Sequence, residues 1–311
     1  MVLRGFLNID KPPGMTSFDV VRQVRRAAGI RKVGHAGTLD PAATGVLPIA
    51  IGDATKLIDE LVDAPKRYRG TIRFGIATDT YDADGAVVAE ADASATTRDR
   101  IEAELDAFRG TIMQVPPAYS AVKRQGVPAY KAARRGEPLE LEARPVTVHE
   151  LGLGELDRSD REHPSVAIEV ACSRGFYVRS LAHDLGQALG VGAHLDGLCR
   201  TAVGSFEVKR ATPLEAACAL LEAGETEDLL HAMDAVLTSW PAVIVGTRDR
   251  ADLRQGRDVI AMPRRDYVAP PVAEGRRRRA RCYGPDGQLV ALLEQSLTVG
   301  AWHPYRVIPP A

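Results

Sequence analysis

The chain has 311 residues, of which 45% are hydrophobic and 26% charged, and its formal net charge is −1. This length is enough to bury a sizeable core without disulfides or structural metals, and it suggests one large domain followed by a small one. No run approaches the roughly 18 apolar residues of a membrane span, and we expect no targeting signal. The four cysteines form no CxxC pair, which argues against a zinc knuckle or a disulfide framework and fits a reducing cytoplasm.

The first predicted element is a helix over about residues 16–28, capped by Thr16 or Ser17 and stopped by Gly29. Its apolar side chains at Phe18, Val21, Val24 and Ala28 share one face, so the arginines between them face away from the core. Residues 1–35 hold seven basic side chains against two acidic ones, and residues 123–135 hold five against none. This segregation can give a neutral protein a basic face for a polyanion, although solvated helix faces would produce the same pattern.

Residues 31–56 read RKVGHAGTLDPAATGVLPIAIGDATK. Glycines within this segment permit tight turns, Pro41 biases Asp40 toward an extended conformation, and an apolar strand over 46–51 follows. Asp40 is therefore a carboxylate on a stiff loop anchored by a buried strand, which is where catalytic groups tend to lie. From spacing alone, an ordinary turn aspartate explains Asp40 equally well.

Further elements follow in chain order. Residues 68–76 alternate as a half-buried strand that turns at Asp84-Gly85 into a second strand over 86–89, and a helix spans about 97–108. Residues 166–172 alternate again and lead into a helix that stops near Gly190. Beyond about residue 240 the chain has short strands between Gly-, Pro- and Arg-rich turns, predicted at 258–262, 278–283, 288–294 and 304–308. Strand pairs mixed with helices, without regular βαβ alternation, predict an α+β fold with a small C-terminal β module.

Several segments together resemble one enzyme family. GHAGTLDPAATGVL is similar to the catalytic motif of TruB-type pseudouridine synthases, and NIDKPPGMTSFDVV to their N-terminal lysine-proline motif. KRYRGTIRFGIATDTYDADG is similar to their tyrosine strand, and PPAYSAVKRQGVPAYKAARRG to their basic RNA-contacting segment. CSRGFYVRSLAHDLG and GAHLDGLCRTAVGSF are similar to their arginine strand and closing motif. These blocks occur in the family's order over the first two thirds of the chain.

The resemblance implies a pseudouridine synthase fold, a mixed and mainly antiparallel sheet with flanking helices. It places the catalytic domain at residues 1–240 and a PUA-like RNA-binding module at 241–311, where Arg276 to Arg279 would contact phosphates. The implied activity is isomerisation of uridine 55 in the T loop of tRNA, with no cofactor and no metal. We expect the protein to bind the T arm of tRNA as a monomer in the cytoplasm, without a membrane or a nucleotide cofactor.

The resemblance also implies site residues. Asp40 would be the catalytic carboxylate, Tyr68 an active-site ring whose hydroxyl serves proton transfer, and Arg179 a bidentate partner that keeps Asp40 ionised. Substrate contacts would come from the following residues: His35, Leu198, Lys11, Tyr177, Lys123 and Arg124. Without the resemblance, the tyrosine and leucine are core residues and the arginine an exposed ion pair. Lys11 has two interpretations, a surface lysine or a support for the active-site region.

Other chemistries fit the sequence less well. DADG at 82–85 resembles half a calcium loop, but the expected first and last ligand positions are Thr80 and Ala91. The histidines show no metal-binding spacing, and residues 172–186 contain no phosphate-binding loop. A non-catalytic RNA-binding protein on the same fold is one rival, against which Asp40, Tyr68 and Arg179 together argue. An aspartyl phosphohydrolase is another, but the neighbouring carboxylate that would hold magnesium is missing.

Overall fold

The computed structural model describes residues 3–124, 126–137, 139–261, 277–298 and 300–310. A ten-stranded sheet forms its centre. The strands run in the order β14 (Thr212–Pro213), β1 (Gly5–Lys11), β3 (Thr44–Ile51), β12 (Ala193–Val203), β4 (Lys66–Phe74), β11 (Ser165–Cys172), β10 (Arg144–Asp157) and β7 (Gly110–Gln114), while β2 (Val33–His35) pairs with β3 and β13 (Phe206–Glu207) with β12. The β1–β14 and β3–β12 pairs are parallel and the other pairs of this sheet antiparallel. The predicted α+β class with a mixed, mainly antiparallel sheet is confirmed.

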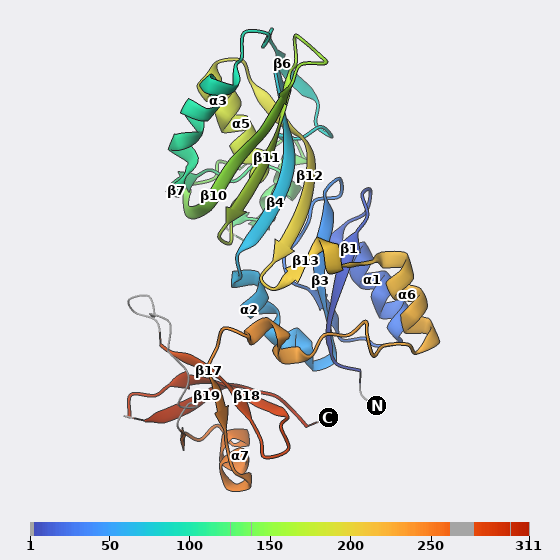
Figure 1. Cartoon of the computed structure of the whole chain (residues 1–311), viewed down its shortest axis with the longest axis vertical. Coiled ribbons are helices and arrows are strands. Elements are labelled where there is room, and N and C mark those ends of the chain that lie inside the picture. Colours follow the sequence, from blue (N-terminus) through green and yellow to red (C-terminus); the bar gives the residue numbers. More distant parts are fainter. Residues whose placement is uncertain (1–2, 125, 138, 262–276, 299, 311) are drawn as a thin grey trace.

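Helices cover the sheet in two groups (Figure 1). Helices α3 (Arg98–Leu105) and α5 (Val178–Leu189) share a buried cluster with β4, β10, β11 and β12. Helices α1 (Ser17–Ala28) and α6 (Leu214–Ala223) share another with β1 and β3. Shorter elements are α2 (Ile58–Asp63) and the 3₁₀ helices η1 (Gly52–Leu57), η2 (Asp106–Phe108), η3 (Val208–Arg210) and η4 (Met233–Leu237). The parallel β3–β12 contact is therefore where two separately packed halves of the sheet meet. In the described ranges, no helix is long and apolar enough to cross a membrane.

The helix predicted over 16–28 is confirmed as α1, and its predicted buried face is confirmed at Val21 and Val24 but not at Phe18. Thr16 forms a capping box with Asp19, and Gly29 ends the helix in a left-handed conformation, with φ of 65°. Phe18, expected in the core, is 60% exposed, whereas Val20 is buried beside Val21 and Val24. The reason is Ser17, which is buried and bonded to the loop of Asp40 and so fixes how the helix is rotated about its axis.

The strand predicted over 68–76 lies two residues earlier than expected, over Lys66–Phe74. It ends at Phe74, because Gly75 turns the chain with φ of 88° and an added Cβ there would lie 2.6 Å from the carbonyl oxygen of Ala91. Beyond this turn, β5 (Ile76–Thr78) leaves the main sheet and pairs with β6 (Val87–Glu90). The hairpin turn near Asp84 therefore joins a separate two-stranded sheet, which lies at the upper end of the molecule in Figure 1.

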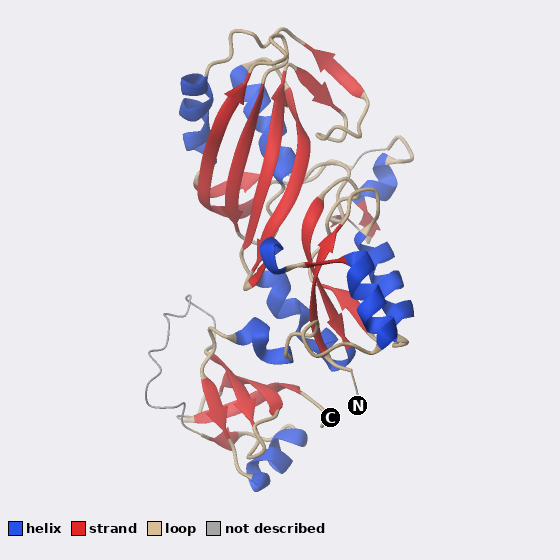
Figure 2. Cartoon of the chain, turned by 45° about the vertical axis from the view of Figure 1, so that its right-hand side comes forward, coloured by secondary structure: helices blue, strands red, loops and turns tan. Residues whose placement is uncertain are grey.

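The predicted C-terminal β module is confirmed, with strands close to the four expected ranges. Its elements are β15 (Ala242–Ile244), α7 (Thr247–Arg254), β16 (Val259–Ile260), β17 (Arg279–Tyr283), β18 (Leu289–Gln295) and β19 (Ala301–Val307). The strands form a five-stranded sheet with its own buried cluster, and Figure 2 shows this sheet set apart from the main one. The first strand and the helix were not predicted, since both are short and weakly patterned.

The module is fastened to the large domain by packing and by charge. Leu292 and Ile308 of the module belong to one buried cluster with Phe6 and Leu57. Arg279 pairs with Glu60 of α2 at 3.0 Å and lies over the rings of Trp240 and Tyr305. The Tyr305 hydroxyl also donates to Glu60, at 2.9 Å.

These contacts change how the predicted phosphate-binding tract is interpreted. Arg276 lies outside the described residues, whereas Arg277 and Arg278 are exposed. Arg279 is also exposed, but it pairs with Glu60 and Glu294 and so joins the module to α2.

Candidate active site

The loop that carries Asp40 runs from β2 to β3 and is held by hydrogen bonds from Lys11, Gly14 and Ser17. The Ser17 hydroxyl donates to the Leu39 carbonyl at 3.1 Å and accepts from the Leu39 amide at 2.8 Å. The Pro41 carbonyl accepts from the Gly14 amide at 2.9 Å and from the Lys11 ammonium at 3.0 Å. Both neighbours of Asp40 are thus hydrogen-bonded to the segment that joins β1 to α1. The carboxylate is presented on fixed backbone, as the sequence predicted.

Lys11 supports this loop from inside the protein. It is fully buried, and its ammonium also donates to the carbonyls of Pro12 and Met15, each at 2.8 Å. Burial lowers the pKa of Lys11 to about 8, although the nearby Asp40 carboxylate opposes this shift. The surface interpretation is therefore wrong, and so is the assignment of Lys11 to the RNA-contacting residues, because its side chain has no exposed area.

The structure brings Arg179 and Asp40 together. The guanidinium Nε lies 3.0 Å from the carboxylate, and Arg179 is buried at the start of α5. The Arg179 guanidinium also has partners other than Asp40. Its Nη1 also lies 3.4 Å from the Asp82 carboxylate and donates to the Thr80 carbonyl at 3.1 Å, and its Nη2 donates to the Tyr119 carbonyl at 3.0 Å. Instead of a dedicated bidentate pair, Asp40 shares one arginine with a second carboxylate.

Asp82 is a site residue that the sequence analysis missed. In the sequence, DTYDADG indicates a turn, resembles half a calcium loop and ends the motif similar to the family's tyrosine strand. None of these assigns a role to its second aspartate, which lies beside Arg179. Tyr81, just before it, has a left-handed φ of 66°, unique among the described non-glycine residues, and its ring stacks on His183 of α5 with centroids 3.8 Å apart. Such backbone strain persists where the surroundings over-determine it. Here it lets Thr80 and Asp82 face the same guanidinium.

The electrostatics of Asp40 combine opposing effects. The side chain remains 41% exposed on one side, while protein atoms surround the carboxyl on the others. This burial raises the pKa of Asp40, the Arg179 charge lowers it, and the Asp82 charge raises it again. The carboxylate is thus open to a ligand, and its charge depends on Arg179.

Tyr68 and Leu198 lie where the two halves of the sheet meet. Both are partly buried and pack against the clusters on both sides of this junction. Burial raises the pKa of Tyr68, whereas the charge of Arg200 and a hydrogen bond from its guanidinium lower it. Leu198 is opposite Gly70 across the β12–β4 pair, where a Cβ on the glycine would lie 3.5 Å from Leu198 Cδ1. The tyrosine and the leucine are therefore neighbours on adjoining strands.

His35 ends β2, five residues before Asp40. The ring is half-buried and its Nδ1 has no hydrogen-bond partner among the described residues. Burial and the nearby Arg200 charge both lower the pKa of His35. The ring is therefore neutral near pH 7, which suits stacking against a base better than pairing with a phosphate.

Tyr177 is held by a glutamine that the sequence analysis also missed. The Gln114 side chain accepts from the Tyr177 amide at 2.8 Å and donates to the Tyr177 carbonyl at 3.0 Å. The Ser180 hydroxyl donates to the Val115 carbonyl at 2.8 Å. These bonds tie the first turn of α5, which carries Arg179, to the segment after β7. The available signal was a glutamine that stands two residues before the segment PPAYS.

Lys123 and Arg124 are exposed and lie apart from these residues. They form β8 (Lys123–Arg124), which pairs only with β9 (Val127–Pro128) and precedes α4 (Ala129–Ala133). Arg124 donates to the Glu140 carbonyl. No described contact joins either residue to Asp40, so the structure leaves them on a basic hairpin beside the site.

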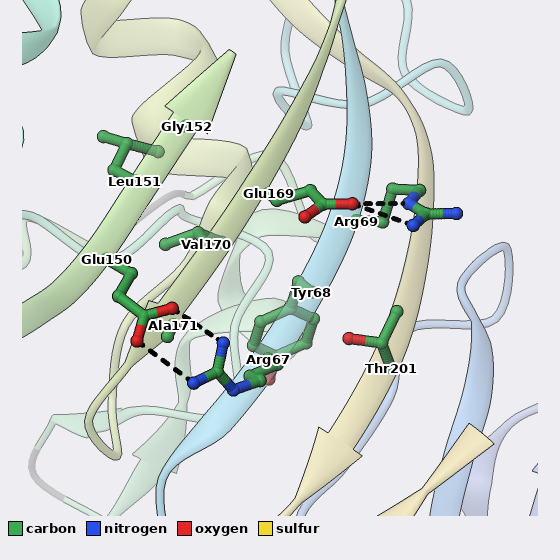
Figure 3. A pocket seen from close by; sticks show the side chains of 10 residues that line it. All are labelled: Arg67, Tyr68, Arg69, Glu150, Leu151, Gly152, Glu169, Val170, Ala171 and Thr201. Atoms are coloured by element: carbon green, nitrogen blue, oxygen red, sulfur yellow. Dashed lines mark hydrogen bonds and ion pairs between the residues drawn. The ribbon is translucent and has the colours of Figure 1, made fainter. Parts of the chain in front are cut away.

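A hollow over β4, β10 and β11 is lined by Tyr68 but by no other residue expected at the site. Figure 3 shows its lining, which includes the exposed pairs Arg67–Glu150 and Arg69–Glu169. Side chains alternate along a strand, so Arg67 and Arg69 point away from the face that carries the Tyr68 ring. Among the described residues, no three His, Cys, Asp or Glu side chains gather as a metal site would require.

Two family models together match residues 25–239 of the chain. The family model described as TruB family pseudouridylate synthase (N terminal domain) matches residues 25–178, and that of the tRNA pseudouridylate synthase B C-terminal domain matches residues 179–239. The tRNA pseudouridine synthase B of Symbiobacterium thermophilum is 49% identical over 252 residues, 81% of this chain and 82% of the relative. That of Paenarthrobacter aurescens is 41% identical over 293 residues, 94% of this chain and 91% of the relative.

Solved structures extend the likeness to the C-terminal module. An H/ACA RNP bound to a substrate RNA containing 2′-deoxyuridine holds a chain that matches with a TM-score of 0.73 and 25% identity, over 98% of this chain and 85% of that chain. A Cbf5-Nop10-Gar1 complex holds one with a TM-score of 0.72 and 27% identity over the same shares. These matches confirm the predicted fold, and the family models and relatives confirm the resemblance seen in the motifs. The chain belongs to the TruB family of pseudouridylate synthases.

Proposed function

We propose that this protein isomerises uridine 55 in the T loop of tRNA to pseudouridine. The observation that carries the proposal is the pairing of Asp40 with Arg179 in a chain of this family, with Asp40 open to a ligand on one side. The reaction needs no net addition or loss of atoms. The N1–C1′ bond breaks, the base turns, and C5 bonds to C1′; C5 loses a proton and N1 gains one.

In this proposal Asp40 is the catalytic carboxylate. It attacks C1′ as a nucleophile, or it removes a ribose proton in a route through a glycal, and both routes require the charged form. Arg179 favours that form, because its charge lowers the pKa of Asp40. Tyr68 and Leu198 bracket the base, and the Tyr68 hydroxyl takes part in proton transfer. This chemistry calls for neither a metal nor a cofactor.

Recognition requires the target base to leave its stack. A loop makes this far less costly than a continuous helix does, and a neutral His35 ring can occupy the vacated place. Tyr177 lies at the same end of α5 as Arg179 and contacts the flipped nucleotide in this proposal. Lys123 and Arg124, on their exposed hairpin, contact phosphates of the T arm.

The remaining expectations are part of the same proposal. The catalytic domain comprises residues 1–240 and the PUA-like module residues 241–311, although one buried cluster is shared between them. The module extends the tRNA contact beyond the T arm through exposed basic residues such as Arg278. We expect a monomer that acts in the cytoplasm.

One experiment separates this function from its rivals. Unmodified tRNA transcript is incubated with the protein, with and without a chelator, and the RNA is analysed for pseudouridine. We expect modification at position 55 in both samples. Binding without modification would indicate a non-catalytic RNA-binding protein, and phosphate release that the chelator abolishes would indicate a phosphohydrolase.

A further inference from the structure

A second arginine, Arg200, lies beneath the candidate active site. It is 1% exposed and belongs to β12, at the parallel contact with β3 and beside β4. Its cross-strand partners are Gly45 on β3 and Tyr68 on β4. One residue thus adjoins both the strand that follows the Asp40 loop and the strand that carries the tyrosine.

The guanidinium of Arg200 donates to three backbone carbonyls on the Asp40 side. Its Nε donates to Val46 at 2.8 Å, its Nη2 to Gly37 at 3.0 Å and its Nη1 to Thr38 at 3.4 Å. Gly37 and Thr38 lie three and two residues before Asp40, and Val46 lies on β3. The arginine therefore bonds the loop on the approach to the carboxylate and again where the chain has entered the strand.

Two glycines, Gly45 and Gly37, pack closely against Arg200. A Cβ on Gly45 would lie 2.3 Å from the Arg200 carbonyl oxygen and 2.9 Å from the Arg200 amide nitrogen. A Cβ on Gly37 would lie 3.4 Å from Nη1. Both glycines also have left-handed φ values, 95° and 91°. The shape of the loop and the place of the guanidinium are thus mutually dependent.

The charge of Arg200 has no carboxylate partner. Within the described part of the chain, no Asp or Glu forms an ion pair with it, although buried charges are ordinarily paired. Carbonyl oxygens satisfy its donors instead, and its field reaches Tyr68, His35 and Lys11. Because burying this charge costs free energy, we infer that Arg200 has a role beyond packing.

We propose that Arg200 is a positioning residue that locks the Asp40 loop and the Tyr68 hydroxyl into one geometry. Arg200 acts through other groups, whereas Arg179 contacts the catalytic carboxylate itself. Arg200 and Tyr68 are cross-strand partners on β12 and β4, so the guanidinium that holds the loop also brings its charge next to the tyrosine. This inference rests on the proposed isomerisation.

Lysine retains the charge of Arg200 but not its geometry. A single ammonium cannot reach carbonyls on two segments and a phenol on a third strand, because it lacks the planar fork of donors. A misplacement of about 1 Å in a reacting group costs about 10²-fold in rate. Arg200→Lys should therefore slow the chemical step while leaving the surfaces that bind RNA unchanged.

The test measures single-turnover isomerisation at saturating enzyme, tRNA affinity and thermal unfolding for wild type, Arg200→Lys and Arg200→Gln. We expect the saturating rate of Arg200→Lys to fall about 10²-fold, with affinity within about threefold of wild type. The control is Lys66→Met, which removes another buried cation, one bonded to the Val62 carbonyl. It should lower the unfolding temperature with a saturating rate within about threefold of wild type.

A double-mutant cycle with Tyr68→Phe separates positioning from general destabilisation. If Arg200 acts partly through the Tyr68 hydroxyl, Arg200→Lys should cost at least about fivefold less in the Tyr68→Phe background, as expected for cross-strand neighbours that are coupled. A folded Arg200→Lys enzyme with a near-normal saturating rate would overturn the inference, as would full additivity with Tyr68→Phe. If neither Arg200 variant folds, Arg200 is a residue of core stability and the inference is lost. Absence of isomerisation by wild type would instead refute the proposed function.

Discussion

Replacing Arg179 by lysine tests the geometry of the site most severely among conservative changes. The guanidinium contacts two carboxylates and two backbone carbonyls, whereas a lysine ammonium is a single point with a shorter reach. A buried carbonyl left without a donor costs about 1 to 3 kcal/mol. Because lysine can retain one of the two carbonyl contacts, we expect a loss of about 1 to 3 kcal/mol in the free energy of unfolding.

The effect on the reaction should be larger than the effect on stability. Without the Nε contact Asp40 can rotate on its loop, and a displacement of about 1 Å corresponds to about 10²-fold in rate. We therefore expect the single-turnover rate at saturating enzyme to fall at least about 10²-fold. The assay uses a tRNA transcript, with urea unfolding in parallel. Arg22→Lys is the matched control, because Arg22 is exposed and pairs only with Asp19 among the described residues; it should leave both measurements unchanged. A folded Arg179→Lys enzyme with near-normal turnover would refute the assigned pairing.

Three further predictions concern the module, the pH dependence and the RNA. Arg279→Ala should lower the free energy of unfolding by about 1 to 2 kcal/mol, because Glu60, which is 8% exposed, loses a partner that is itself partly screened by solvent. Arg278→Ala is measured beside it. An unchanged unfolding curve together with a reduced salt dependence of tRNA binding would identify Arg279 as a phosphate contact instead. In Arg179→Met, the fall of the residual isomerisation rate at acidic pH should occur at higher pH than in wild type, because the Arg179 charge lowers the pKa of Asp40 and the protonated carboxyl is inactive. If the rate falls at the same pH as in wild type, Asp40 does not set this pH dependence. An isolated T-arm stem-loop should be a substrate while the same sequence in a continuous duplex is not, and equal rates on both would contradict recognition by base flipping.

Local signals in the sequence predicted local structure well. The capping box at Thr16 and the stop at Gly29 delimit α1 as expected, and the glycine-flanked loop of Asp40 is fixed as its composition indicated. Phe18 was wrongly placed on the buried face of α1, because hydrophobic periodicity cannot foresee a buried Ser17 that bonds a loop 22 residues away. The buried polar contact of Ser17, and not the apolar side chain of Phe18, therefore determines which face of α1 turns toward the core.

The residues missed at the site share a physical cause. Asp82, Gln114 and Arg200 act through partners that lie between 63 and 163 residues away in the chain. No periodicity or turn signal connects such residues, and each stands in a segment with a plausible local explanation. Their roles become visible only when the sheet brings β12 beside β3 and α5 beside the β5–β6 hairpin.

One measurement tests most directly whether Asp40 performs the isomerisation. Wild type and Asp40→Asn are compared in single-turnover reactions on unmodified tRNA, with pseudouridine mapped along the RNA and binding measured in parallel. The amide keeps the shape of the side chain and removes its charge. We predict pseudouridine at position 55 with wild type, and with Asp40→Asn near-normal binding but a rate at least about 10³-fold lower, since neither the nucleophile nor the base remains. Substantial pseudouridine formation by Asp40→Asn would contradict the assignment of this carboxylate.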